Sequence, residues 1–453
     1  MTNRNPLTHP RIPAAGESAL NALCGNLSIG TNGELRFAGQ DVAELAARHG
    51  TPLYLMDEDR VRDNCRTYTE AFSRLFRPGS MVLYASKANC FRRMMQVVAE
   101  EGLGADVVSP GEIWTALRAG FDPARIFFHS NNKTAADVAF AMERGIGYFV
   151  VDHAYEIELI EAEAARRDLR QKVLLRITPG IDTHTYEAVN TGKVDSKFGS
   201  AIETGQAEAI TALTLAQPHV ELCGFHCHVG SMVFAEDVFE RTVELMVGFL
   251  ADVRAALGYT ADMLDLGGGY GVRYTAEDPA IDIPRKLEDV AAALRLSCAL
   301  RDYPEPLLLM EPGRSISADA GLTVYQVGAV KRIPGYKNYV SVDGGMSDNP
   351  RYALYGSHYT CLLAARPAAE GELICDVVGR CCESGDVIQP NVSLPADVRE
   401  GELLAVCTTG AYNYSMASNY NRIPRPPIVM LHNGTDDVAV RRETLEDLIA
   451  LDV

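Results

Sequence analysis

The chain has 453 residues, of which 42 are basic and 60 acidic, so its formal net charge is −18. This acidity disfavours nucleic acid or an anionic membrane surface as the partner, although a small pocket can carry the opposite charge. The opening residues contain no apolar core of signal-peptide length, and no run approaches the roughly 20 apolar residues of a membrane span. The eleven cysteines follow no regular spacing, so we expect reduced thiols in a cytoplasmic protein.

The first fifty residues contain a hairpin pattern, "LSIGTNGELRFAG", with Asn32 and Gly33 at its turn. From Met81 to Pro312, short apolar or β-branched runs alternate with helical patterns long enough to be crossover helices. Eight such units indicate a (β/α)8 barrel of the TIM type, and a doubly wound open sheet is the alternative. The eight runs are "MVLYAS", "GADVVS", "RIFFHS", "GYFVVD", "KVLLRI", "LCGFHCHV", "DMLDLG" and "PLLLMEP".

After Pro312 the pattern changes to short strand-like runs separated by Gly, Pro and Asp, with no convincing helix between them. This part predicts an antiparallel β domain, a barrel or a sandwich, which the N-terminal hairpin is expected to join. The fold class is therefore α/β plus all-β. We expect the α/β barrel at residues 53–312 and the β domain at residues 1–52 and 313–453. The four runs are "LTVYQVGAV", "NYVSVDG", "ICDVVGR" and "LLAVCTTG".

Polar side chains stand where the predicted barrel strands end, which is where barrels of this type carry their chemistry. The first run ends at Lys87, followed by small residues. A lone lysine at such a place is most often only solvated, but a ring of polar residues favours a reactive site. The other strand-end residues are Asp106, Ser109, His129, Ser130, Asp152, Arg176, His226, His228 and Glu311.

The segment "HCHVGS" places His226 and His228 two residues apart, and on a strand they would share a face. Such a pair could bind zinc, but no third ligand has suitable spacing, so an imidazole packed on an aromatic ring is the better interpretation. Ser231 offers a hydroxyl to an anion. The three glycines of "LDLGGGYG" let the backbone approach a phosphate closely. The dinucleotide fingerprint fails here, because Val272 stands where it needs glycine.

In "MEPGRS", Glu311 ends a strand and Arg314 follows it. A salt bridge between them is the plain interpretation. Alternatively, the carboxylate could face a pyridine nitrogen, and the guanidinium could grip a phosphate or a substrate carboxylate. Together with Lys87, a phosphate cradle and a stacking imidazole, these residues suit pyridoxal 5′-phosphate, whose aldehyde reacts with a lysine.

The sequence resembles the alanine-racemase-like, fold-type III pyridoxal-phosphate decarboxylases, and within them the diaminopimelate decarboxylase family. The resemblance extends from about Thr51 to about Pro426 and rests on several motifs in the same order. These are "YASKAN", "GADVVSPGE", "TGKVDSKFG", "HCHVGS", "LGGGYG", "EPGR", "DGGMSDNPRYALY", "CCESGD" and "GAYNYSMASNYN".

The resemblance implies a role for each matching residue. Lys87 would bond to the cofactor, His228 would stack on its ring, and Glu311 would face its pyridine nitrogen. Cys382 would return a proton to the substrate carbon; a thiol can do so, but spacing alone does not choose between Cys381 and Cys382. The other implied cofactor contacts are Asp106, Ser231, Gly268, Gly269, Gly313, Arg314 and Tyr412, and the implied substrate contacts are Arg314, Arg351, Tyr355, Glu383 and Tyr412.

The resemblance also implies a homodimer with shared sites that converts meso-2,6-diaminopimelate to L-lysine and CO2. Rival substrates for the same chemistry are D-ornithine or D-lysine, L-ornithine or L-arginine, and carboxynorspermidine. Arginines and Glu383 favour diaminopimelate, because it carries a second carboxylate and a second amine. A catalytically silent relative is disfavoured because both Lys87 and Cys382 are present, and "CCESGD" points to decarboxylation rather than racemization.

Three places depart from the usual family pattern and bear on the substrate more than on the cofactor. Met232 stands where glutamine is frequent, and Tyr352 stands where proline is frequent. The stretch "HTYEAVNTG" is an unusual version of the segment before "TGKVDSKFG". Because the segment from His184 to Gly199 is rich in Thr, Asn and Gly, we expect a mobile lid there.

Overall fold

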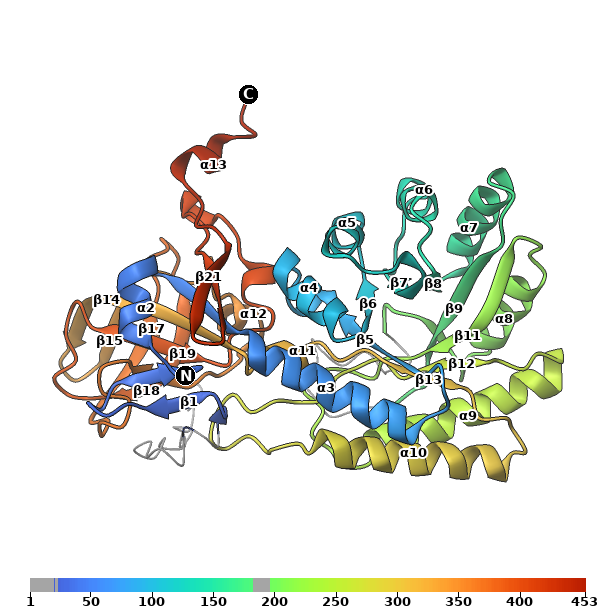
Figure 1. Cartoon of the computed structure of the whole chain (residues 1–453), viewed down its shortest axis with the longest axis horizontal. Helices are drawn as coiled ribbons and strands as arrows, with labels where there is room; N and C mark the ends of the chain where they lie inside the picture. The colour runs from blue at the N-terminus through green and yellow to red at the C-terminus, as the bar shows by residue number, and fades with distance from the viewer. Residues whose placement is uncertain (1–19, 21–22, 182–195) are drawn as a thin grey trace, which may run out of the picture. The chain divides into compact units, whose positions relative to one another are not determined.

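The computed structural model describes residues 20, 23–181 and 196–453 (Figure 1). A lid is expected from His184 to Gly199, and its residues up to 195 lie outside the described residues. No helix in the described part of the chain is both long enough and apolar enough to cross a membrane. The chain divides into a β unit, formed by Met1–Arg60, Arg273–Asp278 and Ala318–Val453, and a barrel unit, formed by Val61–Val272 and Pro279–Ser317.

The barrel unit contains the predicted closed sheet of eight parallel strands. The strands are hydrogen-bonded in the order β9-β11-β12-β13-β5-β6-β7-β8, and β8 pairs again with β9, so no edge is left open. The TIM-type prediction is thus confirmed, and the open doubly wound sheet is excluded. The strands are β5 (Met81–Ala85), β6 (Gly104–Val107), β7 (Ile126–Phe128), β8 (Tyr148–Val151), β9 (Gln171–Thr178), β11 (Val220–His226), β12 (Met263–Asp265) and β13 (Leu307–Met310).

These strands are recognisable in the sequence because nearly every residue in them is buried. A parallel sheet covered on both faces reads as a continuous apolar run rather than an alternating one. Side chains from five strands pack together, including the stacked rings of Phe127 and Tyr148, whose centroids are 4.3 Å apart. The barrel is therefore a packed core rather than a pore.

A helix follows each barrel strand, and local signals fix where these helices begin. Ser109 accepts a hydrogen bond from the backbone of Glu112 at the start of α5, and Thr134 and Asp137 form a capping box at the start of α6. Figure 1 shows α5 to α8 lying outside the strands. The helices are α3 (Glu58–Leu75), α4 (Arg92–Glu100), α5 (Pro110–Ala119), α6 (Ala135–Glu143), α7 (Ala154–Arg166), α8 (Gln206–Leu215), α9 (Val238–Leu257), α10 (Ile283–Leu300) and α11 (Arg314–Ser317).

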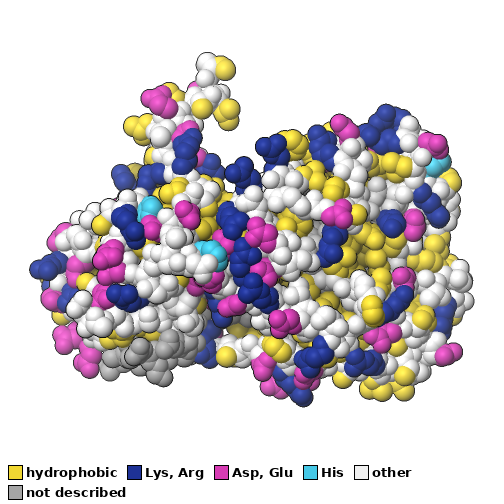
Figure 2. All heavy atoms as spheres, viewed as in Figure 1, with side chains coloured by type: hydrophobic (Ala, Val, Ile, Leu, Met, Phe, Trp, Pro, Cys, Tyr) yellow, Lys and Arg dark blue, Asp and Glu magenta, His cyan; other side chains and the backbone are white. Residues whose placement is uncertain are grey.

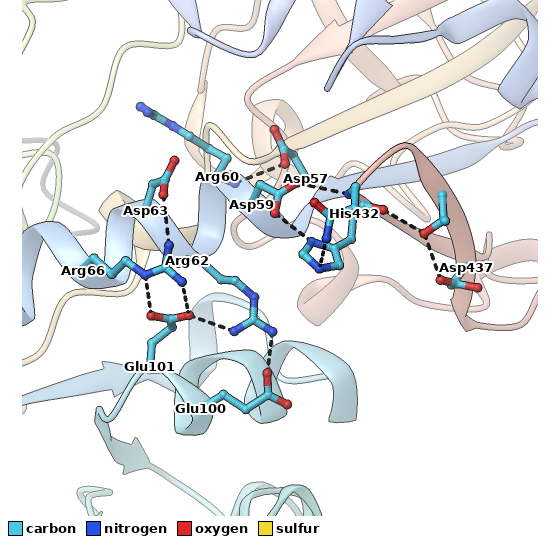
Figure 3. Close-up of polar contacts among 12 residues, drawn as sticks. Asp57, Asp59, Arg60, Arg62, Asp63, Arg66, Glu100, Glu101, His432 and Asp437 are labelled. Carbon is cyan, nitrogen blue, oxygen red and sulfur yellow. Dashed lines mark hydrogen bonds and ion pairs between the residues drawn. The ribbon is translucent and has the colours of Figure 1, made fainter.

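Ion pairs hold α3 against the end of α4 within the barrel unit (Figure 3). Arg62 Nη1 lies 2.8 Å from Glu101 Oε1, and Arg66 Nε lies 2.8 Å from Glu101 Oε2. In the β unit, Asp59 Oδ1 lies 2.7 Å from His432 Nδ1. Such partly exposed pairs contribute about 0–1 kcal/mol each, so they align the helices more than they stabilise the fold. Acidic and basic side chains are interspersed over the visible surface in Figure 2.

The β unit is built around a nine-stranded sheet that is mostly antiparallel, as expected from the runs after Pro312. Two pairs in it are parallel, β15 with β17 and β4 with β20, because these partners are joined by long connections instead of tight turns. The strands of this sheet are β4 (Leu53–Asp57), β14 (Gly321–Ile333), β15 (Lys337–Val342), β16 (Cys361–Leu363), β17 (Leu373–Val378), β18 (Val387–Leu394), β19 (Leu403–Cys407), β20 (Ile428–His432) and β21 (Thr435–Val440).

The N-terminal hairpin packs into the β unit. Strands β1 (Leu27–Ile29) and β2 (Leu35–Phe37) are antiparallel, and Gly33 in their turn has a φ of +86°. Strand β3 (Gln40–Asp41) and helix α2 (Val42–His49) follow. Buried side chains of the hairpin share one core with β4, β14 and β19.

The structure differs from the sequence-based description of the β unit in two respects. Strand β4 pairs with β14 and β20, so Leu53–Asp57 lies in the β unit and not at the start of the barrel. Two short helices also occur where no helix was expected, because each is a single turn with too few residues to show a period. Helix α12 (Arg351–Tyr355) lies between β15 and β16, and α13 (Leu445–Ile449) follows β21.

Candidate active site

Lys87 lies at the carboxyl end of β5, in a short 3-10 turn that spans Ser86–Ala88. Its side chain is 43% exposed, and its Nζ lies 3.5 Å from Oδ2 of Asp106, which is buried at the end of β6. Asp106 Oδ1 accepts no hydrogen bond from the described residues. A lysine held against a buried carboxylate, yet open to a small molecule, is a better nucleophile candidate than a solvated strand cap.

Three buried groups meet at the ends of β7, β11 and β13. His129 Nε2 lies 2.7 Å from Glu311 Oε1, and His226 Nε2 lies 3.3 Å from Glu311 Oε2. Burial alone would raise the pKa of Glu311, but the two imidazoles outweigh it and hold that pKa well below its ordinary value. Burial lowers the pKa of His226 to about 4. The geometry therefore presents an ionised Glu311 in contact with two imidazoles.

The same three residues converge closely enough to raise the question of a metal ion. The 2.7 Å contact between His129 and Glu311 is shorter than the roughly 3.3 Å between ligand atoms of a tetrahedral site with bonds of about 2.0–2.1 Å. This spacing suits an imidazole–carboxylate pair better than two zinc ligands. His228, which the sequence pairs with His226, is not among the described residues that converge here.

His228 instead faces the glycine turn after β12. Its Nδ1 accepts a hydrogen bond of 3.2 Å from the backbone of Gly268. Burial, together with the nearby charges of Lys87 and Arg176, lowers the pKa of His228 well below its ordinary value. The ring is therefore neutral, and its flat face is suited to stacking on an aromatic ring.

The glycines of this turn are required by close contacts between backbone segments. A Cβ on Gly268 would lie 2.1 Å from the carbonyl oxygen of Glu311, and one on Gly269 would lie 2.1 Å from that of Gly230. Next to them, Arg314 Nη2 donates to Ser231 Oγ over 3.0 Å. The segments that carry Ser231, Gly268 and Arg314 thus form one backbone cradle, which suits an anion.

We expect a substitution of Gly268 by alanine to weaken binding of an anionic cofactor about ten- to hundredfold, because overpacking of this kind costs about 1–3 kcal/mol. The dissociation constant of the cofactor, measured by fluorescence quenching, checks this. Gly248→Ala is the control, since a Cβ on Gly248 in α9 would meet its nearest neighbour at 3.6 Å. Equal affinities of the two variants would show that the turn does not cradle the anion.

In the β unit, three residues expected to bind substrate lie together. The guanidinium of buried Arg351 lies 5.0 Å from the ring centroid of Tyr355 and 5.3 Å from that of Tyr412. Tyr412 has a φ of +62°, a left-handed conformation that is unusual for a bulky residue and typical of functional sites. An arginine flanked by two aromatic rings can bind a carboxylate while its own position stays fixed.

The two adjacent cysteines differ sharply in their surroundings. Cys381 is buried, and burial raises the pKa of its thiol. Cys382 is exposed, and its backbone N–H donates to Asn421 Oδ1 over 2.8 Å. Glu383 is also exposed, and its Oε1 accepts a hydrogen bond from the backbone of Gly385 in its own loop. Of the two thiols, only that of Cys382 is available to a substrate.

Two buried acids near these groups were missed in the sequence. Asp265 ends β12, and its pKa is raised well above its ordinary value by burial and by the charge of Glu311. Asp386 bonds to the loops of the β unit. Asp265 could have been found, because it ends a strand like the residues of the polar ring. Asp386 is the last residue of "CCESGD", but nothing in that motif distinguishes this acid from a solvated one.

The comparisons with known proteins agree with this chemistry. Residues 58–318 match the family model described as "Pyridoxal-dependent decarboxylase, pyridoxal binding domain". A diaminopimelate decarboxylase of Bacillus subtilis is 42% identical, with 93% of this chain and 96% of that protein covered. One of Actinosynnema pretiosum is 44% identical, with 98% of each covered.

A crystal structure of diaminopimelate decarboxylase from M. jannaschii, in complex with L-lysine, superposes with a TM-score of 0.86. It is 32% identical in sequence, and the match covers 95% of this chain and 98% of that one. Similarity of this extent includes both the barrel unit and the β unit. The chain therefore belongs to the diaminopimelate decarboxylase family of pyridoxal-phosphate-dependent enzymes.

Proposed function

We propose that this protein removes one carboxylate of meso-2,6-diaminopimelate to form L-lysine and CO2, with pyridoxal 5′-phosphate as its cofactor. The observation that carries the proposal is the position of Lys87, beside Asp106 at the open ends of the barrel strands where ionised Glu311 also lies. The family membership supports the choice of reaction.

The residues of the barrel unit fit the proposed cofactor. The glycine turn leaves no space for side chains where backbone segments meet, as a phosphate cradle requires. Ser231, Gly268, Gly269, Gly313 and Arg314 would hold the phosphate. Asp106 Oδ1 is buried, lies 3.7 Å from His129 Nε2 and accepts no hydrogen bond from the described residues. When bound, the cofactor supplies an electron sink for the electron pair that remains as CO2 leaves.

Each barrel residue then has a defined task. Lys87 would supply the amine that bonds to the cofactor. The neutral ring of His228 would stack on the cofactor ring. Glu311 stays anionic because its pKa is held low, and it would favour a protonated pyridine nitrogen. Asp106 stabilises the charged amine of Lys87 before reaction.

The residues of the β unit handle the substrate. Arg351, with Tyr355 and Tyr412 on its faces, would bind a carboxylate, and Arg314 of the barrel unit is a second candidate for a carboxylate contact. Glu383 holds the distal amino group. Cys382 donates a proton to the α-carbon after CO2 departs, which is general-acid catalysis by a thiol. The exposure of Cys382 supports this assignment over Cys381.

We also propose a cytoplasmic homodimer with shared sites. Cys382 and Glu383 are both exposed on the chain taken alone. Catalytic groups in such a position suit a site completed by a second copy, in which water is excluded from the reaction. All eleven cysteines are free, which accords with a reducing compartment.

The purified protein, loaded with pyridoxal phosphate, tests the substrate assignment. CO2 release is measured with meso-diaminopimelate, D- and L-lysine, D- and L-ornithine, L-arginine and carboxynorspermidine. We expect kcat/KM for meso-diaminopimelate to exceed the others by at least about a hundredfold, because a substrate without the second carboxylate leaves an arginine unpaired. Preference for a simple diamino acid would leave the role of Lys87 unchanged and would contradict the roles proposed for Arg351 and Glu383.

A further inference from the structure

Asp386 is a buried carboxylate that joins two loops of the β unit. The residue is only 3% exposed. Oδ1 accepts a hydrogen bond of 2.6 Å from the backbone N–H of Met346, and Oδ2 accepts one of 2.7 Å from that of Cys381. Each oxygen therefore holds a different segment of the chain.

The first of these segments, which contains Cys381, is the connection from β17 to β18. It also carries Cys382 and Glu383. Gly379 N donates to Asp386 O over 3.1 Å, Glu383 N donates to Cys381 O over 2.8 Å, and Asp386 N donates to Glu383 O over 3.1 Å. The loop is thus closed at its base by Asp386. Its exposed tip presents the thiol of Cys382.

The second segment, which contains Met346, follows β15 and leads directly into α12, which begins at Arg351. Asn349 N donates to Gly345 O over 2.8 Å, and Gly345 N donates to Asp348 Oδ2 over 2.9 Å. A further backbone bond, from Arg380 N to Gly344 O over 3.0 Å, links this segment to the first. Movement of Met346 would therefore be transmitted to the start of α12.

The space around the carboxylate is shaped for it. A Cβ on Gly345 would lie 2.7 Å from Asp386 Oδ1, and one on Gly379 would lie 2.3 Å from Oδ2. A carboxylate only accepts hydrogen bonds, so it satisfies both N–H groups at once. An amide of the same shape accepts at one end and would turn its own NH2 toward the other N–H.

We propose that Asp386 is a positioning residue for the reaction, which holds the loop of Cys382 and the loop that leads to Arg351 in place within the β unit. The inference rests on the proposed function for the roles of those two residues. Proton donation to a carbon depends on placement, and an error of about 1 Å can cost about a hundredfold in rate. The hydrogen bonds of Asp386 are the part of the β unit that sets this placement.

Asp386→Asn tests the proposal, with Asp376→Asn as a matched control. Asp376 is also a buried acid, in β17, and it also accepts a backbone hydrogen bond, of 3.0 Å from Asn391. Its partners, Asn391 in β18 and Lys337 in β15, both lie outside the two loops. Each variant therefore removes a buried carboxylate from the β unit, and only the carboxylate of Asp386 is hydrogen-bonded to the loop of Cys382.

Two properties of the holoenzyme are measured. The first is the rate at which iodoacetamide alkylates Cys382, located by peptide mass spectrometry; this readout needs no turnover, and Cys382 is the exposed thiol among eleven. The second is kcat and KM for meso-diaminopimelate. For Asp386→Asn we expect alkylation to change at least about fivefold and kcat to fall about ten- to hundredfold, with a smaller change in KM. Asp376→Asn should leave both properties near wild type.

A fall in thermal stability alone, with alkylation and kcat unchanged in Asp386→Asn, would overturn the proposal. If Asp386→Asn does not fold, Gly345→Ala replaces it, since its Cβ displaces the carboxylate without removing it. The same shifts in alkylation and kcat are then expected, and wild-type values would count against the proposal. Failure of the proposed function is distinguishable, because the wild-type protein would then release no CO2 while the alkylation comparison still decides the role of Asp386.

Discussion

Replacing Lys87 with alanine should abolish decarboxylation, by at least about three orders of magnitude, and should remove the visible absorption of the covalently held cofactor. Lys133, unlike Lys87, is buried near the strand ends, and its Nζ lies 2.6 Å from Glu156 Oε1 and 2.8 Å from the carbonyl oxygen of Val150. The amine of Lys133 is therefore held by these partners and is not available to bond to a cofactor.

The measurement is an absorption spectrum of the purified variant with added cofactor, followed by a CO2-release assay. Lys286→Ala is the control, because Lys286 lies on α10 and donates to the carbonyl oxygen of Glu236. It should keep both the colour and the turnover. Survival of colour and turnover in the Lys87 variant would mean that a different amine holds the cofactor.

Replacing Cys382 with alanine should reduce kcat about 10²- to 10⁴-fold while cofactor absorption stays unchanged. In the proposed assignment Cys382 acts on the substrate and does not bind the cofactor, so its loss removes a proton donor and not a cofactor contact. Cys381→Ala should retain kcat, because its thiol is buried and its pKa is raised by burial. The adjacent cysteine thus serves as an internal control for changes in the loop.

Steady-state kinetics and the cofactor spectrum of the two cysteine variants check this expectation together. A large loss in Cys381→Ala with a normal Cys382→Ala would move the proton donor by one residue. Equal and small losses in both would assign proton donation to another group, and the tyrosines beside Arg351 would be examined next.

The barrel could be predicted from the sequence because its order is local. Each strand is a short, fully buried run, and each is followed by a helix with its own caps, as at Ser109 and Thr134. The chemistry at the strand ends followed from the same regularity, since the carboxyl ends of parallel strands meet at one end of a barrel.

The pairing of strands in the β unit could not be predicted in the same way. Which strand lies beside β4 depends on contacts between residues far apart in the chain, and no local pattern records them. The contact of His129 with Glu311 has the same origin, because it joins β7 to β13 through the fold. Asp386 was missed because a single acid in a loop is indistinguishable from a solvated one until its partners are known.

The pairing of β4 with β20 has a consequence for synthesis on the ribosome. Its partner residues, Leu53–Asp57 and Ile428–His432, are separated by about 370 residues. At about 5–20 residues per second, β4 leaves the ribosome roughly 20–70 seconds before β20 exists. The barrel unit, whose chain lies between them, can begin to fold during that interval. Strand β4 must stay unpaired on that side throughout, so it is a segment of the nascent chain that needs protection by a chaperone.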